Sequence, residues 1–184
     1  DGETMKAAAC AKHFAVHSGP EALRHEFDAE VSEKDLRETY LPAFQACVQE
    51  GHVEAVMGAY NCVNGEPCCG SKTLLKKILR EEWGFDGHVV SDCWAIKDFH
   101  ENHLVTGTPV QSAALAMEAG CDLNCGVTYL HLVHACQQRL VTEAQITEAA
   151  IRLFTTRILL GIFDGSEYDS VPYTVVECKE HRDL

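Results

Sequence analysis

The sequence lacks a long hydrophobic run, an excess of basic charge and any glycine-rich phosphate loop. No apolar stretch in its 184 residues approaches the ~20 residues that a membrane-spanning helix needs. Its 15 basic and 28 acidic residues give a net charge of −13, which argues against nucleic acid and membranes as partners. The missing Gly-x-Gly-x-x-Gly and phosphate-loop motifs disfavour nucleotide binding. These absences favour a globular protein that acts on neutral molecules.

The cysteines lack the spacing of a metal site, although the chain has ten cysteines and ten histidines. No Cys-x-x-Cys pair occurs, and Cys121 and Cys125 lie four residues apart. Most cysteines lie in apolar segments, where a free thiol behaves as a small hydrophobe. We therefore expect buried, reduced thiols, a cytoplasmic location and no cofactor. A zinc or redox protein that uses Cys121, Cys125, His131 and His134 is an alternative hypothesis.

Short apolar runs alternate with longer amphipathic ones along the chain. Four strands that are each followed by a helix predict an α/β fold, with a parallel sheet and right-handed crossovers. Half a barrel and a small doubly wound sheet both fit this pattern. The expected strands are 5–10, 53–60, 88–91 and 121–124, and the expected helices begin at Ser32, Ser71, Thr108, Leu130 and Thr142.

One carboxylate, Asp92, follows the apolar strand in the segment 83–94. Chemistry in parallel α/β proteins collects at the carboxyl ends of strands. A buried Asp is costly there unless it is hydrogen-bonded or used in a reaction. On this local pattern alone, a catalytic carboxylate and an ordinary cap of the next helix are equally good interpretations.

Four blocks of sequence resemble glycoside hydrolase family 3, the β-glucosidase and β-xylosidase group, and they occur in the family's order over nearly the whole chain. The resemblance implies the C-terminal half of a (β/α)8-like catalytic barrel, a partial TIM-like barrel, over residues 1–163. It also implies that residues 164–184 are a linker towards a second domain. The blocks are Lys12-His13-Phe14, Val56–Asn61 with Asn64-Gly65, Gly84–Gly87 with Val90-Ser91-Asp92, and Ala119–Leu123.

The resemblance assigns roles to individual residues. Asp92 is expected to be the nucleophile that forms a covalent glycosyl intermediate. Lys12 and His13 are expected to bind the sugar at the non-reducing end. Tyr60 is expected to place its hydroxyl against the nucleophile, with an ordinary core aromatic as the alternative. Trp94 is a candidate wall for the sugar and Met57 a candidate pocket residue, and both side chains would also suit a core.

The general acid/base is expected to be a Glu outside this chain, in the second domain. The N-acetylglucosaminidase branch of the family instead carries an Asp-x-His dyad in the loop after the Lys-His pair. Here Leu23 stands two residues before His25, so no carboxylate partner is available at that position and we do not assign the dyad to this chain. Three local carboxylates are candidates, each also explained as a solvated residue: Glu21, Glu66 and Glu101.

The sequence is therefore interpreted as a fragment of a retaining, exo-acting β-glycosidase that is inactive alone. Its expected partners are β-linked xyloside or glucoside oligosaccharides, and its oligomeric state stays open. Ser91-Asp92-Cys93 resembles the xylosidases, whereas Trp94 does not, and we lean slightly towards xylosides. The rival hypothesis is a non-catalytic carbohydrate-binding module or degenerate glycosidase. Because the first residue is Asp1 rather than Met, we expect a missing natural N-terminus, and secretion stays open.

Overall fold

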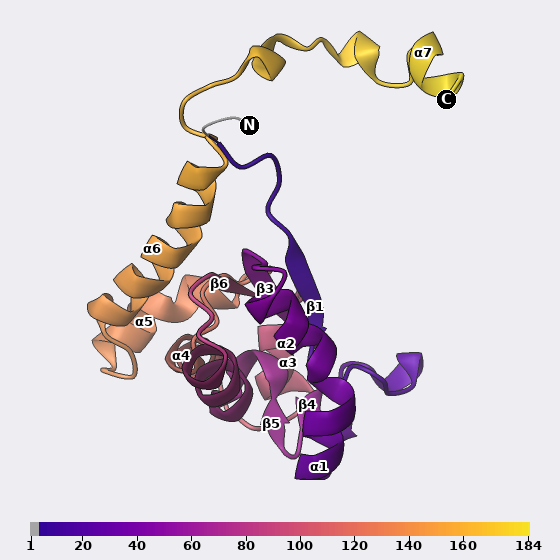
Figure 1. Cartoon of the computed structure of the whole chain (residues 1–184). Coiled ribbons are helices and arrows are strands. Elements are labelled where there is room, and N and C mark those ends of the chain that lie inside the picture. Colours follow the sequence, from indigo (N-terminus) through magenta and orange to yellow (C-terminus); the bar gives the residue numbers. More distant parts are fainter. Residues whose placement is uncertain (1–3) are drawn as a thin grey trace.

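The computed structural model describes residues 4–184, so the first three residues of the expected barrel segment lie outside the described residues. Strands and helices alternate along most of the chain (Figure 1). The strands are β1 (Cys10–Phe14), β2 (Asp28–Ala29), β3 (Ala55–Gly58), β4 (Cys62–Val63), β5 (Glu66–Pro67) and β6 (His88–Ser91). The α-helices are α1 (Glu33–Asp35), α2 (Pro42–Gln49), α3 (Ala95–Glu101), α4 (Pro109–Ala119), α5 (Leu132–Gln137), α6 (Glu143–Leu159) and α7 (Lys179–Arg182).

Shorter or wider helical segments complete the chain. Two are π-type, Leu36–Tyr40 and Thr73–Glu82. The others are 3-10 turns at Glu21–Leu23, Cys68–Gly70, Thr128–His131, Glu167–Ser170 and Tyr173–Val175. Among the helices of residues 4–184, none combines the length and the hydropathy that crossing a bilayer requires.

The central sheet is parallel, with strand order β1-β3-β6. In register, Val56 of β3 faces Val89 of β6, and Met57 faces Val90. Val56 and Val89 are fully buried, whereas Met57 and Val90 are partly exposed, because successive side chains on a strand point to opposite faces. The sheet therefore has one face packed beneath helices and one face that is partly open.

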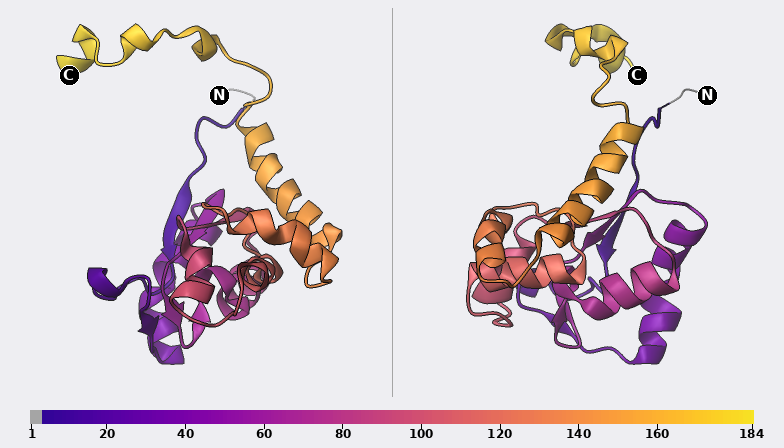
Figure 2. Two further views of the ribbon diagram at one scale, coloured as in Figure 1. Left: turned by 180° about the vertical axis from the view of Figure 1, so that it is seen from behind. Right: turned by 90° about the vertical axis from the view of Figure 1, so that its left-hand side faces the viewer.

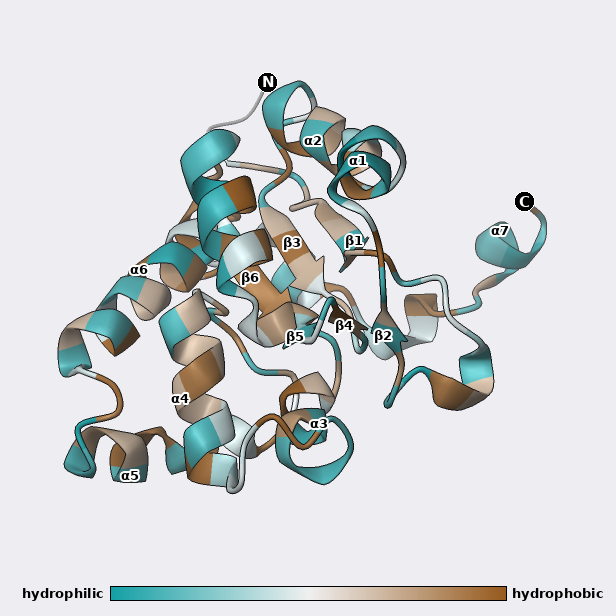
Figure 3. Cartoon of the chain, turned by 90° about the horizontal axis from the view of Figure 1, so that it is seen from below, coloured by the Kyte–Doolittle hydropathy of each residue, from teal (hydrophilic) through white to brown (hydrophobic). Residues whose placement is uncertain are grey.

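The packed face holds the main core. The strands β3 and β6 are apolar, whereas α1 is polar (Figure 3). No side chain fits at Gly58, because an added Cβ would lie 2.7 Å from the Cys69 sulfur. The core joins sheet and helix residues that are all nearly inaccessible: Phe14, Val56, Leu74, Leu75, Ile78, Leu79, Val89, Ile96 and Phe99.

Several predicted helix boundaries are confirmed. Thr108 caps α4 by accepting from the Gln111 amide, and Gly120 ends that helix with φ 96°. Thr142 and Gln145 form the expected capping box of α6. Pro42 separates α2 from the preceding π-type segment, Leu36–Tyr40. It begins α2 at the first helical position, where its missing N–H needs no partner.

Two strand predictions were partly wrong. The first strand is Cys10–Phe14 rather than residues 5–10. The expected fourth strand, 121–124, is reduced to one parallel bridge between Val90 and Leu123. The segment between the expected strand 53–60 and the expected helix at Ser71 contains the β4–β5 hairpin, turned at Asn64-Gly65 with positive φ at both residues. This hairpin pairs with β2 in a second small sheet that the local pattern did not reveal.

Residues 164–184 leave the body after α6 and extend away from it with short helical turns (Figures 1 and 2). Large apolar side chains such as Tyr168 and Tyr173 are exposed there. This course is compatible with the predicted linker, and the division at residue 163 stays a prediction.

A buried carboxylate joins the strand layer to the helices. The side chain of Asp122, 1% exposed, accepts hydrogen bonds from Arg80 Nη2 at 2.9 Å and Arg152 Nε at 3.2 Å. The Val89 amide donates to the same carboxylate at 2.8 Å. Burial raises the pKa of Asp122, and the amide and the two guanidinium groups oppose that rise. The carboxylate thus anchors β6, the segment Thr73–Glu82 and α6 at one point.

We expect Asp122→Asn to lower the free energy of unfolding by about 3–5 kcal/mol, because it leaves the largely buried guanidinium group of Arg80 without its ion-pair partner, whereas Arg152 keeps Glu148 at 2.7 Å. Urea unfolding of the whole protein that contains this chain measures the change. Glu118→Gln is the matched control, since Glu118 pairs with Lys72 at 2.7 Å on the surface and should contribute less than about 1 kcal/mol. Equal effects of the two substitutions would contradict the anchoring role.

Candidate active site

Asp92 lies directly after β6, at the carboxyl end of the parallel sheet. Its amide donates to the Gly58 carbonyl at 3.1 Å, which continues the β3–β6 pairing by one residue. Its carboxylate Oδ1 accepts from the Cys93 amide at 2.8 Å. The N-cap position of α3 is Trp94, and no side chain caps this end of the helix. Asp92 is therefore not the cap of α3.

His13, on β1, reaches the same edge of the sheet. Its Nε2 lies 3.4 Å from Asp92 Oδ2, and the two side chains are 28% and 14% exposed. Burial lowers the pKa of His13, the carboxylate of Asp92 opposes that shift, and the ammonium group of Lys12 adds to it. Lys12 is exposed and near enough to His13 to act on its charge. The structure thus brings the predicted Lys-His pair and the predicted nucleophile together.

Tyr60 stands two residues beyond β3 and belongs to the same group. Burial and the nearby charge of Asp92 raise the pKa of the Tyr60 hydroxyl, while Arg24 opposes the rise. The hydroxyl is therefore held in its protonated form and can donate to the carboxylate. His103 fixes the backbone here, with its Nε2 2.9 Å from the Tyr60 carbonyl.

A disulfide lies beside the carboxylate, between Cys93 and Cys125. The expectation that all cysteines are reduced is therefore wrong, because the fold brings two residues 32 positions apart into contact. The Trp94 amide also donates to the Cys125 carbonyl at 2.6 Å, and the Cys125 amide donates to Ser91 Oγ at 3.0 Å. The residues that flank Asp92 are thus tied to the loop after Leu123.

The remaining cysteines fit the original interpretation more closely. Cys68 and Cys69 are fully buried free thiols, and burial raises the pKa of Cys68 to about 12. The disulfide nevertheless removes the support for a cytoplasmic location, since stable disulfides are rare in reducing compartments. That location stays a prediction.

Trp94 and Met57 lie apart from the Lys-His group. Trp94 has φ 70°, a left-handed conformation, and its side chain is half exposed next to Gly126. Met57 lines a cavity of about 370 Å³ on the open face of the sheet, together with Val90 and Leu123. We therefore place Met57 in the cavity on the open face of the sheet. Trp94 stays a candidate for a side chain that contacts the sugar.

Sequence reasoning missed the partners of the loop that follows β1. His25 Nδ1 lies 2.8 Å from Asp98 Oδ2, so His25 has a carboxylate partner although the position two before it is a leucine. The partner comes from α3, 73 positions away, and not from the two positions before His25. The same loop carries His17, whose ring lies 5.1 Å from that of His13 and whose Nδ1 lies 3.2 Å from Asn61 Oδ1.

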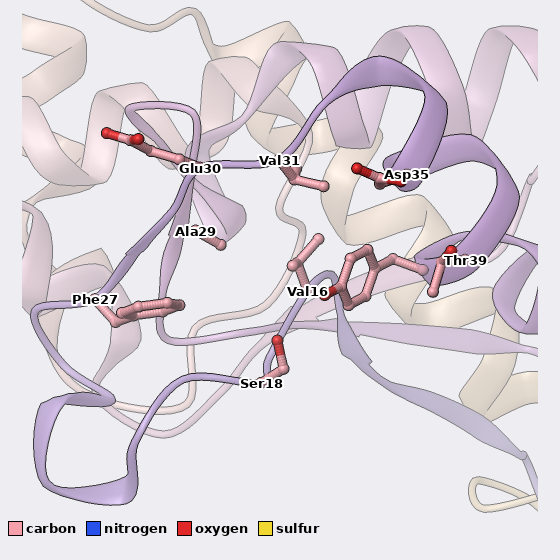
Figure 4. A pocket seen from close by; sticks show the side chains of 9 residues that line it. Val16, Ser18, Phe27, Ala29, Glu30, Val31, Asp35 and Thr39 are labelled. Carbon is pink, nitrogen blue, oxygen red and sulfur yellow. The ribbon is translucent and has the colours of Figure 1, made fainter.

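A separate hollow of about 320 Å³ lies beside β2, next to the loop that carries His25 (Figure 4). Phe27, Val31 and Tyr40 form its apolar wall, and Asp35 and Thr39 form its polar rim. None of the residues predicted to carry chemistry lines it.

The local acid/base candidates are all engaged elsewhere. Glu21 pairs with Arg24 at 2.6 Å, and Glu101 pairs with Lys97 at 2.8 Å. Glu66 accepts hydrogen bonds from Ser71 and Thr73. The part of the chain that the structure describes contains no group of three or more His, Cys, Asp or Glu residues able to hold a metal ion. Cys125, one of the four proposed zinc ligands, is bonded to Cys93.

The geometry defines a class of protein. A parallel α/β sheet presents a partly buried carboxylate at its carboxyl end, with an imidazole 3.4 Å away, a tyrosine nearby and a lysine next to the histidine. Neutral donors and one cation around one carboxylate suit covalent attack on a neutral substrate that carries many hydroxyl groups.

Comparison with known proteins gives the family. The family model described as Glycosyl hydrolase family 3 N terminal domain matches residues 2–160. The chain belongs to glycoside hydrolase family 3. It is 43% identical over 185 aligned residues to a xylan 1,4-β-xylosidase of Xylanibacter ruminicola, an alignment that covers 97% of this chain and 22% of that protein. The chain thus spans less than a quarter of that relative's length.

Solved structures show the same fold. A family 3 exo-β-xylosidase in complex with a xylobiose aziridine probe superposes with TM-score 0.87 at 31% identity, covering 100% of this chain and 25% of that one. A β-glucosidase from Listeria innocua in complex with isofagomine superposes with TM-score 0.82 at 32% identity, covering 96% of this chain and 25% of that one. The predicted fold class, part of a TIM-type barrel, is thereby confirmed.

We predict that Asp92→Asn lowers the pKa of Tyr60, because removing the neighbouring negative charge makes the phenolate easier to form. Ultraviolet difference titration in alkaline solution measures the change, with Tyr60→Phe identifying the signal that belongs to Tyr60. An unchanged Tyr60 titration in Asp92→Asn would place the hydroxyl away from the carboxylate.

We also predict that alkylation without reductant leaves Cys93 and Cys125 unlabelled, although the Cys93 residue is exposed. Reduction should expose both thiols and speed hydrogen exchange of the Trp94 amide, which loses its fixed acceptor at Cys125. Peptide mapping by mass spectrometry checks both. Free, alkylated Cys93 in the untreated protein would contradict the disulfide.

Proposed function

We propose that this chain is the part of a retaining, exo-acting β-glycosidase that supplies the nucleophile, and that β-xylosides are the preferred substrates. The observation that carries the proposal is the position of Asp92: it lies at the carboxyl end of β6, with His13 Nε2 3.4 Å from its Oδ2 and with Tyr60 near enough for the charge of Asp92 to raise the pKa of the tyrosine hydroxyl. The family relationship supports the reaction class.

In the proposed first step, an oxygen of the Asp92 carboxylate attacks the anomeric carbon of the sugar. A bond forms between that carbon and the carboxylate, and the bond from the carbon to the leaving oxygen breaks. The leaving oxygen takes a proton from a general acid. In the second step the same group, now a base, takes a proton from water, and the water oxygen displaces the carboxylate.

Donors around Asp92 are suited to this sequence. The Tyr60 hydroxyl and the Cys93 amide stabilise the carboxylate in the free protein and keep it oriented. Lys12 is exposed at the same edge and is free to reach sugar hydroxyl groups, while His13 offers one ring nitrogen to Asp92 or to the sugar. Hydrogen bonds that strengthen as charge develops on the sugar would lower the barrier.

The preference for xylosides rests on similarity. The relative at 43% identity is named a xylan 1,4-β-xylosidase, whereas the β-glucosidase structure is 32% identical.

The general acid/base is proposed to be a glutamate outside this chain. Glu21, Glu66 and Glu101 are each hydrogen-bonded to neighbouring side chains away from Asp92. We therefore expect the isolated chain to have little or no activity, and activity tests need the whole protein.

A non-catalytic carbohydrate-binding module is the second candidate. It would use exposed Lys12 and Trp94 to hold a sugar. It gives no reason for a tyrosine hydroxyl directed at a partly buried carboxylate, which a binding surface does not need.

The test is steady-state hydrolysis of 4-nitrophenyl β-xyloside and β-glucoside by the whole protein and its Asp92→Asn variant. We expect turnover to fall by several orders of magnitude, which corresponds to a rise of more than about 4 kcal/mol in the barrier. The substitution removes the nucleophile and conserves the shape of the side chain. Asp86→Asn is the matched control, because Asp86 is exposed and lies before the same strand, at the opposite end from Asp92.

Near-normal turnover by Asp92→Asn would overturn the nucleophile assignment. A wild-type protein that binds xylo-oligosaccharides and hydrolyses neither substrate would favour the binding module. A higher kcat/KM on the glucoside would overturn the proposed preference.

A further inference from the structure

Behind Tyr60 lies a chain of polar contacts that the proposed reaction does not use. The His25 ring packs edge-on against the Tyr60 ring, with centroids 4.5 Å apart and an interplanar angle of 62°. The guanidinium carbon of Arg24 lies 5.4 Å from the centroid of the same ring. Tyr60 is therefore enclosed by two consecutive residues of the loop after β1.

The His25 ring is fixed at both nitrogens. Its Nδ1 lies 2.8 Å from Asp98 Oδ2, and its Nε2 accepts a hydrogen bond from Arg24 Nε at 3.2 Å. An arginine can only donate, so His25 Nε2 must be the acceptor, and His25 Nδ1 then carries the proton and donates to Asp98. In this arrangement the ring carries one proton, on Nδ1. That proton is already donated to Asp98 and is not available to a substrate.

The carboxylate that holds His25 is itself fixed. Asp98 is 4% exposed and lies on α3, the helix that follows the Asp92 turn. Its other oxygen, Oδ1, accepts from Asn102 Nδ2 at 2.6 Å, one helical turn further on. A buried carboxylate with two satisfied oxygens is a rigid anchor.

These contacts start and end at the same helix–strand unit. Asp98 lies six residues after Asp92, and the path returns to Asp92 through His25 and Tyr60. The loop with Arg24 and His25 otherwise projects from the body at its 3-10 turn, Glu21–Leu23 (Figure 2). Asp98 thus ties a projecting loop onto Tyr60, the tyrosine that lies beside the nucleophile.

We propose that the Asp98–His25 pair is a positioning device that presses the Tyr60 ring into place and so directs its hydroxyl at Asp92. Neither residue touches the reacting atoms. The inference rests on the proposed function, because the position of Tyr60 matters only if Asp92 is a nucleophile. A small rotation of the tyrosine ring would withdraw its hydroxyl from the carboxylate, and misplacements of about 1 Å can cost up to ~100-fold in rate.

The test uses the whole protein, with His25→Phe as the principal variant. Phenylalanine conserves a ring against Tyr60 and removes the hydrogen bonds to Asp98 and Arg24. We expect covalent labelling by a 2-deoxy-2-fluoro-β-xyloside to slow about 10- to 100-fold, with the inhibitor's binding constant unchanged. Asp98→Ala should have the same effect, and kcat should fall while KM stays within about twofold.

His100→Phe is the matched control. His100 lies on the same helix as Asp98, is also partly buried, and has its Nδ1 2.9 Å from the hydroxyl of Ser112 rather than near Tyr60. The labelling rate of His100→Phe should stay within about twofold of the wild type. Thermal unfolding of every variant separates loss of function from loss of folding.

A double-mutant cycle with Tyr60→Phe decides whether His25 acts through the tyrosine hydroxyl. We expect His25→Phe to add less than about twofold to the effect of Tyr60→Phe, because the hydroxyl that it positions is already absent. Two independent effects that multiply would overturn the proposal. So would loss of the alkaline limb of the pH–rate profile in His25→Phe, since that result would make His25 a proton donor.

The failure of this inference is distinguishable from failure of the proposed function. If Asp92→Asn abolishes labelling while His25→Phe labels at the wild-type rate, the nucleophile stands and the positioning device falls. If the wild-type protein takes no label while Asp92 is intact, the proposed function falls, and with it this inference.

Discussion

The parallel pairing of β3 between β1 and β6 is the constraint on which the rest of the structure depends. It aligns Gly58 with Ser91, the last residue of β6. The amide of the following residue, Asp92, then donates to the Gly58 carbonyl of β3. The same pairing places Phe14 of β1 opposite Gly58. Side chains that are far apart in sequence, His13 and Asp92, therefore meet at one edge, where all three strands end.

The rigidity of that edge comes from ties behind it. Asp122 forms ion pairs with Arg80 and Arg152 and accepts the Val89 amide, which fixes β6 to the segment Thr73–Glu82 and to α6. The Cys93–Cys125 disulfide fixes the turn directly after Asp92. A carboxylate that must attack one carbon atom gains most from such ties, because the rate depends steeply on the distance and angle of attack.

How far the site could be predicted differed from residue to residue. Asp92, Lys12, His13 and Tyr60 stand at or near strand ends in motifs that resemble the family. The structure brings His13 and Tyr60 near Asp92, with Lys12 next to His13, and the roles of these residues stay predictions. The partner of His25 was sought within the loop itself and was missed, since it comes from α3. The disulfide was missed for the same reason: spacing along the chain says little about two cysteines that meet through strand pairing.

By itself the sequence determined the apolar strand 88–91, the caps at Thr108 and Thr142, and the carboxylate at the strand's end, because these follow from local hydrogen bonds and alternating burial. Only the tertiary structure decided where β1 begins, that 121–124 contributes one bridge rather than a strand, and which residues surround Tyr60. Those features depend on contacts between elements that are distant in sequence, and neither periodicity nor propensity encodes such contacts.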